Sequence, residues 1–467
     1  MKRLYLLPLA ASLLLTSCAI GPNYTRPQVP VPPQYRGAQQ GASASSVAQV
    51  KPFDLFHDAE LTELLKTALA HNEDLQIAAQ RVLEARAQYG IARSNQFPSL
   101  DATGTFEAAR SSSVGSYTFV PSNLSLAASY TQAGFSLSWE LDLWGRLRRL
   151  SESARAQYLA TEEAQHGVES TVIADVMTNY LSLLELDSEL EIAKQTQEVA
   201  QHGLKLTEIR RAQGAATGLD VRQAEELLYS AIAQTAATQR EIGKTEDALS
   251  LLLGRDPAAV PRDRRLSDIP DTAEIPSGLP STLLERRPDI RQAEDTLISA
   301  NAEIGAAKAL YFPQISLTGF LGGQSRSLSA LFTGPARLWT IAPAGDLPIF
   351  NAGRLRNNVR YTEARKREMI ATYEKSIQNG FREVSDALIE HQKDREQRQQ
   401  EELFVKALRE ADRLSQLRYK GGLDSYLQVL DAERNLFQGE LTLARLRRDE
   451  LLSMVDLYRA LGGGWQQ

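Results

Sequence analysis

The longest patterns in the sequence are helical. Two long stretches, residues 146–213 and 354–420, place apolar side chains three and four positions apart, as Ile377, Phe381 and Val384 do. This is the heptad-like spacing with which one helix packs along another. At 1.5 Å per residue, each stretch predicts a helix of about 100 Å.

Shorter helical stretches flank each long one. We expect them at residues 66–96 and 220–253 around the first, and at 281–311 and 425–461 around the second. In each set, the two short stretches together have nearly the length of the long one. The pattern therefore predicts two short helices, stacked end to end, packed antiparallel against one long helix.

Alternation of apolar and polar residues predicts four strands. Two of them, at residues 100–108 and 133–143, precede the first long helix; two more, at 315–322 and 337–349, precede the second. Segments of about 9–11 residues match strands that cross a bilayer. Prolines interrupt the fourth segment, so its alternation is the poorest of the four.

Four strands are too few to close a barrel within one chain. Bacterial barrels begin at about eight strands, and an open strand edge in lipid leaves backbone groups unpaired. Because an eight-stranded barrel is filled by its own side chains, an open pore favours three or more chains. We expect the strand carboxylates Asp101, Glu107, Glu140 and Asp142 to face the lumen and to favour cations.

The two halves of the body are copies of one design. Residues of the first half recur 215 positions later before the strands, and 208 positions later after them. The matched pairs include Ala85 and Ala300, Gly90 and Gly305, Phe97 and Phe312, Gly145 and Gly353, and Leu253 and Leu461. Two related halves indicate an internal duplication and a pseudo-symmetric fold.

The N-terminus has the pattern of a secretory signal. Lys2 and Arg3 precede an apolar run that is too short to span a bilayer as a helix, which needs roughly 20 residues. The run ends at Leu15-Thr16-Ser17-Cys18, which resembles a bacterial lipobox. We expect cleavage before Cys18, the only cysteine, whose sulfur would carry diacylglycerol and whose amino group would carry an acyl chain such as palmitate. The alternative is a chance cysteine near an ordinary cleavage site.

These features divide the chain into six parts. They are a lipoprotein signal peptide (1–17), a lipid anchor with a proline-rich tether (18–50), a first repeat (51–254), a linker (255–280), a second repeat (281–462) and a C-terminal tail (463–467). The residue after the cysteine is Ala19 rather than Asp. By resemblance to bacterial lipoproteins, this implies release to the outer membrane.

Composition and charge exclude several functions. A formal net charge of −6 is not typical of a nucleic-acid-binding protein. The five histidines show no ligand spacing, and no phosphate loop, nucleophile elbow or dinucleotide fingerprint is present. We therefore expect no catalytic residue, no metal site and no cofactor other than the covalent lipid on Cys18.

Several short motifs occur in order along the chain. They are Gly21-Pro22-Asn23-Tyr24, Glu285-Arg286-Arg287-Pro288-Asp289-Ile290, two Phe-Pro pairs, and Arg418-Tyr419-Lys420-Gly421-Gly422 before Tyr426-Leu427-Gln428-Val429-Leu430-Asp431-Ala432-Glu433. With them, essentially the whole mature chain resembles the TolC-like outer-membrane efflux factors. The resemblance is to the lipidated OprM/NodT-type branch, which serves resistance-nodulation-division (RND) efflux systems.

The resemblance implies a fold and an assembly. The fold is that of an α+β membrane protein, built as a homotrimer. Each chain contributes four strands to a trimeric 12-stranded outer-membrane β-barrel, continuous with a long periplasmic α-helical coiled-coil barrel.

The resemblance also implies a gate at the periplasmic tip, where the helical hairpins turn. Matched residue by residue, the gate comprises Arg418, Tyr419, Asp424, Leu427 and Asp431. Leu427 would form an apolar constriction, Asp431 an acidic ring, and Arg418 an ion pair across the closed tip. The alternative for Asp431 is a carboxylate favoured by the helix N-terminal dipole.

One residue departs from the family pattern, and a further set of residues is expected to bind a partner. Gln428 stands where some relatives carry a second Asp, which puts a double acidic ring in doubt. The residues expected to dock on an adaptor are those of the two turns: Gly214, Ala215, Thr217, Gly218, Gly421, Gly422 and Leu423.

The implied function is that of the outer-membrane channel in a tripartite efflux system. It would export drugs or other toxic small molecules, metal ions included, by passive conduction. Its partners would be a periplasmic adaptor (membrane fusion) protein, an inner-membrane RND-type pump and outer-membrane lipid, with no nucleic acid. Two alternatives stay open: a type I protein-secretion channel, and a periplasmic coiled-coil scaffold lipoprotein. The sequence does not identify the cargo.

Overall fold

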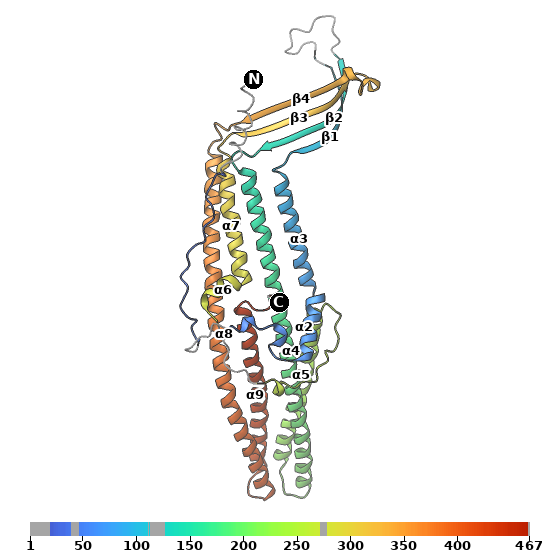
Figure 1. Cartoon of the computed structure of the whole chain (residues 1–467). Helices are drawn as coiled ribbons and strands as arrows, with labels where there is room; N and C mark the ends of the chain where they lie inside the picture. The colour runs from blue at the N-terminus through green and yellow to red at the C-terminus, as the bar shows by residue number, and fades with distance from the viewer. Residues whose placement is uncertain (1–18, 39–45, 111, 113–126, 271–277, 466–467) are drawn as a thin grey trace. The chain divides into compact units, whose positions relative to one another are not determined.

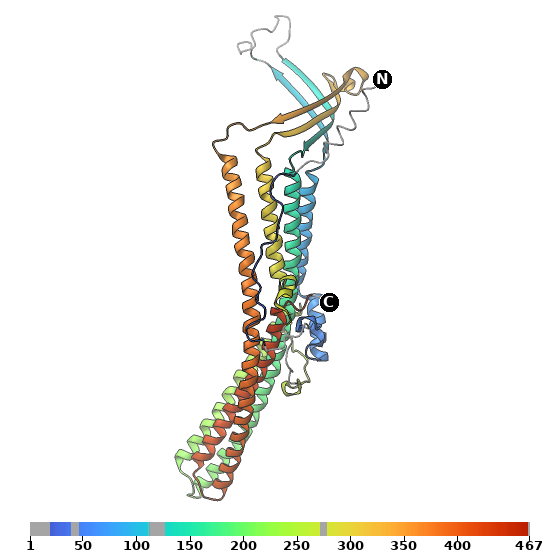
Figure 2. The same ribbon diagram turned by 60° about the vertical axis from the view of Figure 1, so that its left-hand side comes forward.

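The structure is a computed structural model that describes residues 19–38, 46–110, 112, 127–270 and 278–465. It is mostly helical and contains one four-stranded sheet (Figures 1 and 2). The chain separates into two compact units, and each is described by itself. The first comprises Met1–Pro27, Leu83–Ala160 and Glu294–Thr372; the second comprises Gln28–Val82, Thr161–Ala293 and Tyr373–Gln467.

The sheet of the first unit is an antiparallel meander with the strand order β1-β2-β3-β4 (Figure 1). Its strands are β1 (Ser99–Arg110), β2 (Ala127–Leu141), β3 (Gln314–Ser325) and β4 (Arg337–Asp346). Register places Phe135 opposite Leu321, and Leu321 opposite Trp339. Because successive side chains of a strand point to opposite faces, the register also sorts the residues of the sheet into two sets.

The two faces of the sheet differ in chemistry. The apolar face carries, among others, Leu100, Phe106, Phe135, Leu137, Leu321, Trp339 and Ile341. The polar face carries, among others, Asp101, Thr105, Glu107, Gln132, Ser136, Glu140, Thr318 and Gln324. Alternation in the sequence therefore corresponds to a real two-sided sheet.

The strand ends differ from those predicted. β2 begins at Ala127 rather than at residue 133, because its first residues pair with the last residues of β1. It ends at Leu141 because Asp142 accepts hydrogen bonds from the backbone N–H groups of Leu147 and Arg148, both at 3.0 Å. The expectation that Asp142 belongs to the strand is wrong, since it follows β2 and caps the next helix. β4 ends at Asp346, before Pro348, which has no N–H to donate.

Residues 20–24 of the first unit run beside two of its helices, α4 (Arg146–Ala212) and α7 (Pro288–Ala309). Asn301 of α7 donates a hydrogen bond to the Pro22 carbonyl at 3.0 Å, and Arg149 of α4 donates to the Asn23 side chain at 2.9 Å. A Cβ at Gly305 would lie 2.6 Å from the Ile20 carbonyl oxygen. Its counterpart in the first repeat, Gly90, has nothing within 4 Å. The N-terminal segment thus breaks the pseudo-symmetry of the repeats.

The second unit has its main core where one long helix meets several shorter elements. Val176, Met177 and Tyr180 of α4 are fully buried. They belong to a cluster with residues of α2 (Ala59–His71), α5 (Gly218–Leu252) and α9 (Tyr426–Ala460). Among the described residues, no helix is both long and apolar enough to span a bilayer.

The helices predicted over 66–96 and 281–311 are each two helices. The first is divided at Asn72 into α2 and α3 (Glu73–Ser94), and the second at Arg287 into α6 (Pro280–Arg286) and α7. Asn72 accepts a hydrogen bond from the Leu75 N–H at 3.1 Å, which caps the new helix. At the second break, Pro288 lacks the N–H that a continuous helix would need.

Candidate functional site: the two hairpin turns

The first turn joins α4 to α5 at the end of the second unit. Gly214 has a φ of +77°, the left-handed conformation that commonly ends a helix. The N–H of Ala215 donates to the Arg210 carbonyl at 2.8 Å, which satisfies a carbonyl at the helix end. Thr217 then caps α5 in a reciprocal box with Asp220. The turn is therefore specified by local hydrogen bonds.

The second turn joins α8 (Arg354–Lys420) to α9 and repeats this design. Gly422, 208 positions after Gly214, has a φ of +70°. The N–H of Leu423 donates to the Arg418 carbonyl at 2.9 Å. Gly218 and Gly421 do not have a positive φ, so the left-handed caps are restricted to one glycine in each turn.

Arg418 pairs with Asp424 within the second turn. Arg418 Nε lies 2.5 Å from Asp424 Oδ2, and its Nη2 lies 3.2 Å from Oδ1. This two-bonded contact lowers the pKa of the Asp424 carboxyl and raises the pKa of the Arg418 guanidinium. In the structure, this pair links the two ends of one turn and does not bridge separate hairpins.

Tyr419 lies between the two hairpins. The Arg210 guanidinium of α4 stacks over the Tyr419 ring at 4.3 Å from its centroid. Tyr419 also contacts the Tyr426 ring, with centroids 5.4 Å apart. Tyr426 is buried, and its hydroxyl would lie 3.0 Å from a Cβ at Gly203 of α4. These contacts join α4 to α8 and α9 next to the turns, where the two helical hairpins lie side by side (Figures 1 and 2).

The apolar residues next to the turns are exposed in the single chain. Leu427 is 48% exposed and Leu423 is 70% exposed. Leu219, which follows the first turn, is 66% exposed and stands 208 positions before Leu427. Sequence analysis missed Leu219, although the repeat offset identifies it. The exposed leucines of the two hairpins therefore offer a surface that a partner would cover.

Asp431 is an exposed carboxylate on α9. It accepts weak contacts from Arg434 at 3.5 Å and from Asn435 at 3.3 Å, both on its own helix. It is therefore available to a neighbouring chain. Cys18, the predicted lipid site, lies outside the described residues.

Glu433 is a half-buried acid that sequence analysis did not single out. Gln416 of α8 donates to Glu433 Oε1 at 3.5 Å and to Asp412 at 3.1 Å, while Glu433 Oε2 has no partner among the described residues. Burial, and then the charge of Asp412, raise the pKa of Glu433 to about 7. Only the packing of α8 on α9 reveals this group.

Within the described part of the chain, no three His, Cys, Asp or Glu side chains gather closely enough to hold a metal ion.

The sequence model of the outer membrane efflux protein family matches residues 64–255 and again residues 279–463. The chain belongs to this family. The two matches follow the two repeats of the chain. It is an outer-membrane protein of efflux systems, as its relatives are.

Individual relatives match over nearly their whole length. The solvent efflux pump outer membrane protein SrpC of Pseudomonas putida is 40% identical over 470 residues, which cover 98% of each chain. The cation efflux system protein CusC of Escherichia coli is 36% identical over 464 residues, 99% of each chain. The crystal structure of a membrane protein from Pseudomonas aeruginosa superposes with a TM-score of 0.88 at 38% identity and covers 96% of this chain and 98% of that one.

Proposed function

We propose that this chain is the outer-membrane channel of a tripartite efflux system, in which three copies form one duct. The observation that carries the proposal is the four-stranded sheet, with one apolar face and one polar face. The order β1-β2-β3-β4 leaves one side of β1 and one side of β4 without a partner strand among the described residues. In a bilayer these backbone groups need partners, because no water is present to replace them.

Three copies supply those partners. Strand β4 of one chain would pair with β1 of the next, and twelve strands fall within the range of known bacterial barrels. The apolar face would then contact lipid, and the polar face would line the lumen. Asp101, Glu107 and Glu140 lie on the polar face and would favour cations.

We propose that the two turns form the periplasmic gate and the adaptor-docking tip. The exposed side chains of Leu427 and Asp431 support roles as an apolar constriction and an acidic ring. We expected Arg418 to form an ion pair across the closed tip. Its pairing with Asp424 instead supports a role in stabilising the second turn. Tyr419 would couple the two hairpins through Arg210, so that movement of one is transmitted to the other.

The proposed partners follow from the family. They are a periplasmic adaptor, an inner-membrane pump of the RND type and outer-membrane lipid, with a covalent lipid on Cys18. The names of the relatives refer to solvents and cations, and we propose toxic small molecules as the cargo. The chain would conduct passively, without catalysis or a cofactor. The two-faced sheet favours this function over a coiled-coil scaffold.

The purified, lipid-modified chain tests the proposal directly. We expect a trimer that migrates faster in an unheated denaturing gel than the oligomer mass predicts and dissociates on boiling. In a planar bilayer, it should form channels whose reversal potential in a KCl gradient indicates cation preference. A water-soluble monomer without a β-signal in circular dichroism would contradict the proposal.

Gate variants provide a second prediction. Leu427→Ala and Asp431→Ala should each raise the resting conductance several-fold, because each removes a group from the proposed constriction. Leu251→Ala is the matched control, since Leu251 is 75% exposed but lies at the opposite end of α5 from its turn. If both gate variants conduct like the control, these residues do not close the channel.

A further inference from the structure

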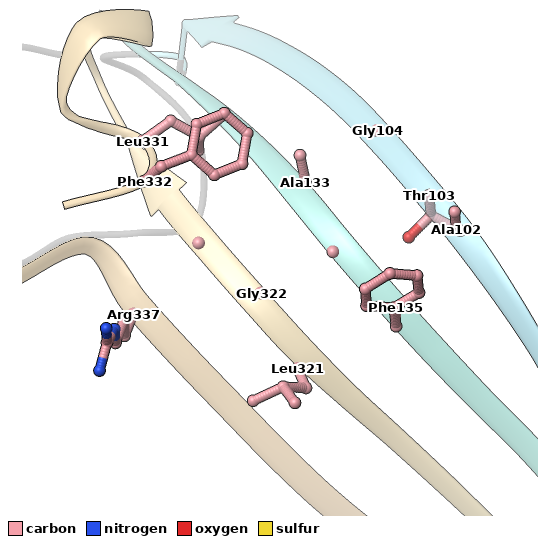
Figure 3. A pocket seen from close by; sticks show the side chains of 12 residues that line it. Ala102, Thr103, Gly104, Ala133, Phe135, Leu321, Gly322, Leu331, Phe332 and Arg337 are labelled. Atoms are coloured by element: carbon pink, nitrogen blue, oxygen red, sulfur yellow. The ribbon is translucent and has the colours of Figure 1, made fainter. Parts of the chain in front are cut away.

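The apolar face of the sheet contains a hollow of about 630 Å³ (Figure 3). Small residues form its floor, among them Ala102, Gly104 and Ala133. Phe135, Leu321 and Phe332 stand around it. This volume lies within the range of roughly 300–1,000 Å³ that is usual for small-molecule pockets.

The connection between β3 and β4 shapes one end of the hollow. It contains two short 3-10 turns, Leu328–Ala330 and Gly334–Ala336. The Leu331 carbonyl oxygen lies only 2.2 Å from where a Cβ at Gly323 would be, so the connection packs directly on the strand. Leu331 is buried as a result, whereas Phe332 is 83% exposed beside the hollow. An aromatic ring held in this exposed position offers a preformed apolar wall.

Charge is distributed unequally between the two faces. Among the strand residues of the apolar face, the charged ones are Arg110 and Arg337, which lie where the strands meet their connecting loops. Every charged strand residue of the polar face is acidic: Asp101, Glu107, Glu140 and Asp346. Neither arginine forms an ion pair with a described residue. The apolar face therefore presents two unpaired cations at one end.

An unpaired guanidinium on a surface that faces lipid is unfavourable unless an anion accompanies it. A phosphate, like a carboxylate, matches its planar fork because it accepts two parallel hydrogen bonds. Arg337 lines the hollow itself, so one molecule could place an apolar chain over the floor of small residues and a phosphate on this arginine. Basic groups that bind anionic lipid headgroups next to an apolar surface follow the same logic.

We propose that this hollow binds an acyl chain of a phosphorylated, multiply acylated outer-leaflet lipid, whose phosphate Arg337 holds. The inference rests on the proposed function, because the apolar face contacts lipid only if the sheet lies in the outer membrane. The bound lipid would act as a structural ligand on the outside of the duct, separate from the cargo inside.

Native mass spectrometry of the detergent-purified trimer with added bisphosphorylated lipid A tests the inference, because it measures how much lipid each variant binds. Arg337→Gln should weaken binding roughly tenfold, since it removes the charge that meets the phosphate. Gly104→Leu should weaken it similarly by filling the floor; a Cβ there meets nothing within 4 Å, so the strand should tolerate the change. Arg367→Gln, at an exposed position of α8, is the matched control and should bind as wild type.

Other ligands define the outcomes. Dephosphorylated lipid A should bind wild type and Arg337→Gln equally, and free phosphate should not compete. Wild-type affinity in both hollow variants would overturn the inference, as would displacement of the lipid by toluene, which would make the hollow a solute site. Gel migration and conductance of the same samples separate the two proposals. A wild-type chain that does not form a trimer contradicts the proposed function. A conducting trimer with unchanged lipid binding in both hollow variants contradicts only the lipid site.

Discussion

Replacing Arg398 with methionine is expected to destabilise the chain by about 3–5 kcal/mol. Arg398 of α8 and Glu450 of α9 form an ion pair in which the two side chains are only 3% and 5% exposed. Arg398 also donates to Glu402 at 2.7 Å. Methionine fills a similar space but leaves the Glu450 carboxylate buried without its cation. The cost is large because the remaining charge has no access to water.

Glu450 is not fully satisfied even in the intact pair. Its Oε1 already lacks a hydrogen bond among the described residues, and the neighbouring His391 Nε2 is also unsatisfied. His391 Nδ1 lies 3.0 Å from the Ser453 hydroxyl, and burial lowers the pKa of this histidine. A neutral histidine would not compensate the freed carboxylate.

Thermal and urea denaturation of the trimer in detergent measure the effect. The control is Arg409→Met, which breaks a pair with Glu440 on the same two helices; Arg409 is 62% exposed and the expected cost is at most about 1 kcal/mol. The double variant Arg398→Met, Glu450→Leu should recover most of the lost stability, because it removes both charges. Equal stability of the two single variants would show that the buried pair contributes no more to stability than the exposed pair.

Stability should fall as the pH rises from about 4.5 to about 7, and Glu433→Gln should reduce this slope. In the folded chain, burial raises the pKa of Glu433 to about 7, from an ordinary value of 4.5. Between these values the folded state binds a proton that the unfolded state has released. The stabilisation is therefore complete below pH 4.5 and is lost as the pH passes 7.

The size of the effect follows from the shift. One pKa unit corresponds to about 1.4 kcal/mol, which sets an upper limit of roughly 3 kcal/mol per chain. Asp412, whose pKa burial also raises, faces Glu433 across Gln416 and contributes part of the same pH dependence. At pH 8, Glu433→Gln should be more stable than wild type, since the amide carries no charge.

Melting temperatures at pH 5 and pH 8 provide the measurement. Glu410→Gln on α8 is the control. Arg413 lowers the pKa of this exposed carboxylate, so removing it should not reduce the fall in stability with rising pH. A wild-type chain whose melting temperature does not fall between pH 5 and pH 8, relative to Glu433→Gln, would contradict the assignment.

Residue periodicity predicted most of the architecture because helices and strands are local structures. A spacing of three and four residues identified both long helices, which end at Ala212 and Lys420, within a residue of the prediction. Alternation identified all four strands and the two faces of the sheet. The breaks at Asn72 and Arg287 were missed. In both cases a single residue redirects the chain through its own hydrogen bonds or a following proline, without disturbing the apolar period.

The site residues divide in the same way. Gly214 and Gly422 were predictable because a helix end requires a left-handed residue, which depends only on nearby backbone. The partner of Arg418 was not predictable, since the sequence allows this arginine to pair either with Asp424 of its own turn or with a carboxylate on another hairpin. Asp142 was misassigned because alternation continues past the end of β2 into the helix cap.

The amino-acid sequence by itself determined the order of the elements, the duplication of the body and the chemical character of each sheet face. The order of the elements and the character of each sheet face depend on residues close to one another along the chain, and the duplication follows from comparing two segments of the sequence. The tertiary structure alone decided which acids are buried, which arginine has a partner, and where glycine leaves room. Burial and pairing join residues such as Arg398 and Glu450, and their energies depend on distance and solvent access, which no linear pattern records.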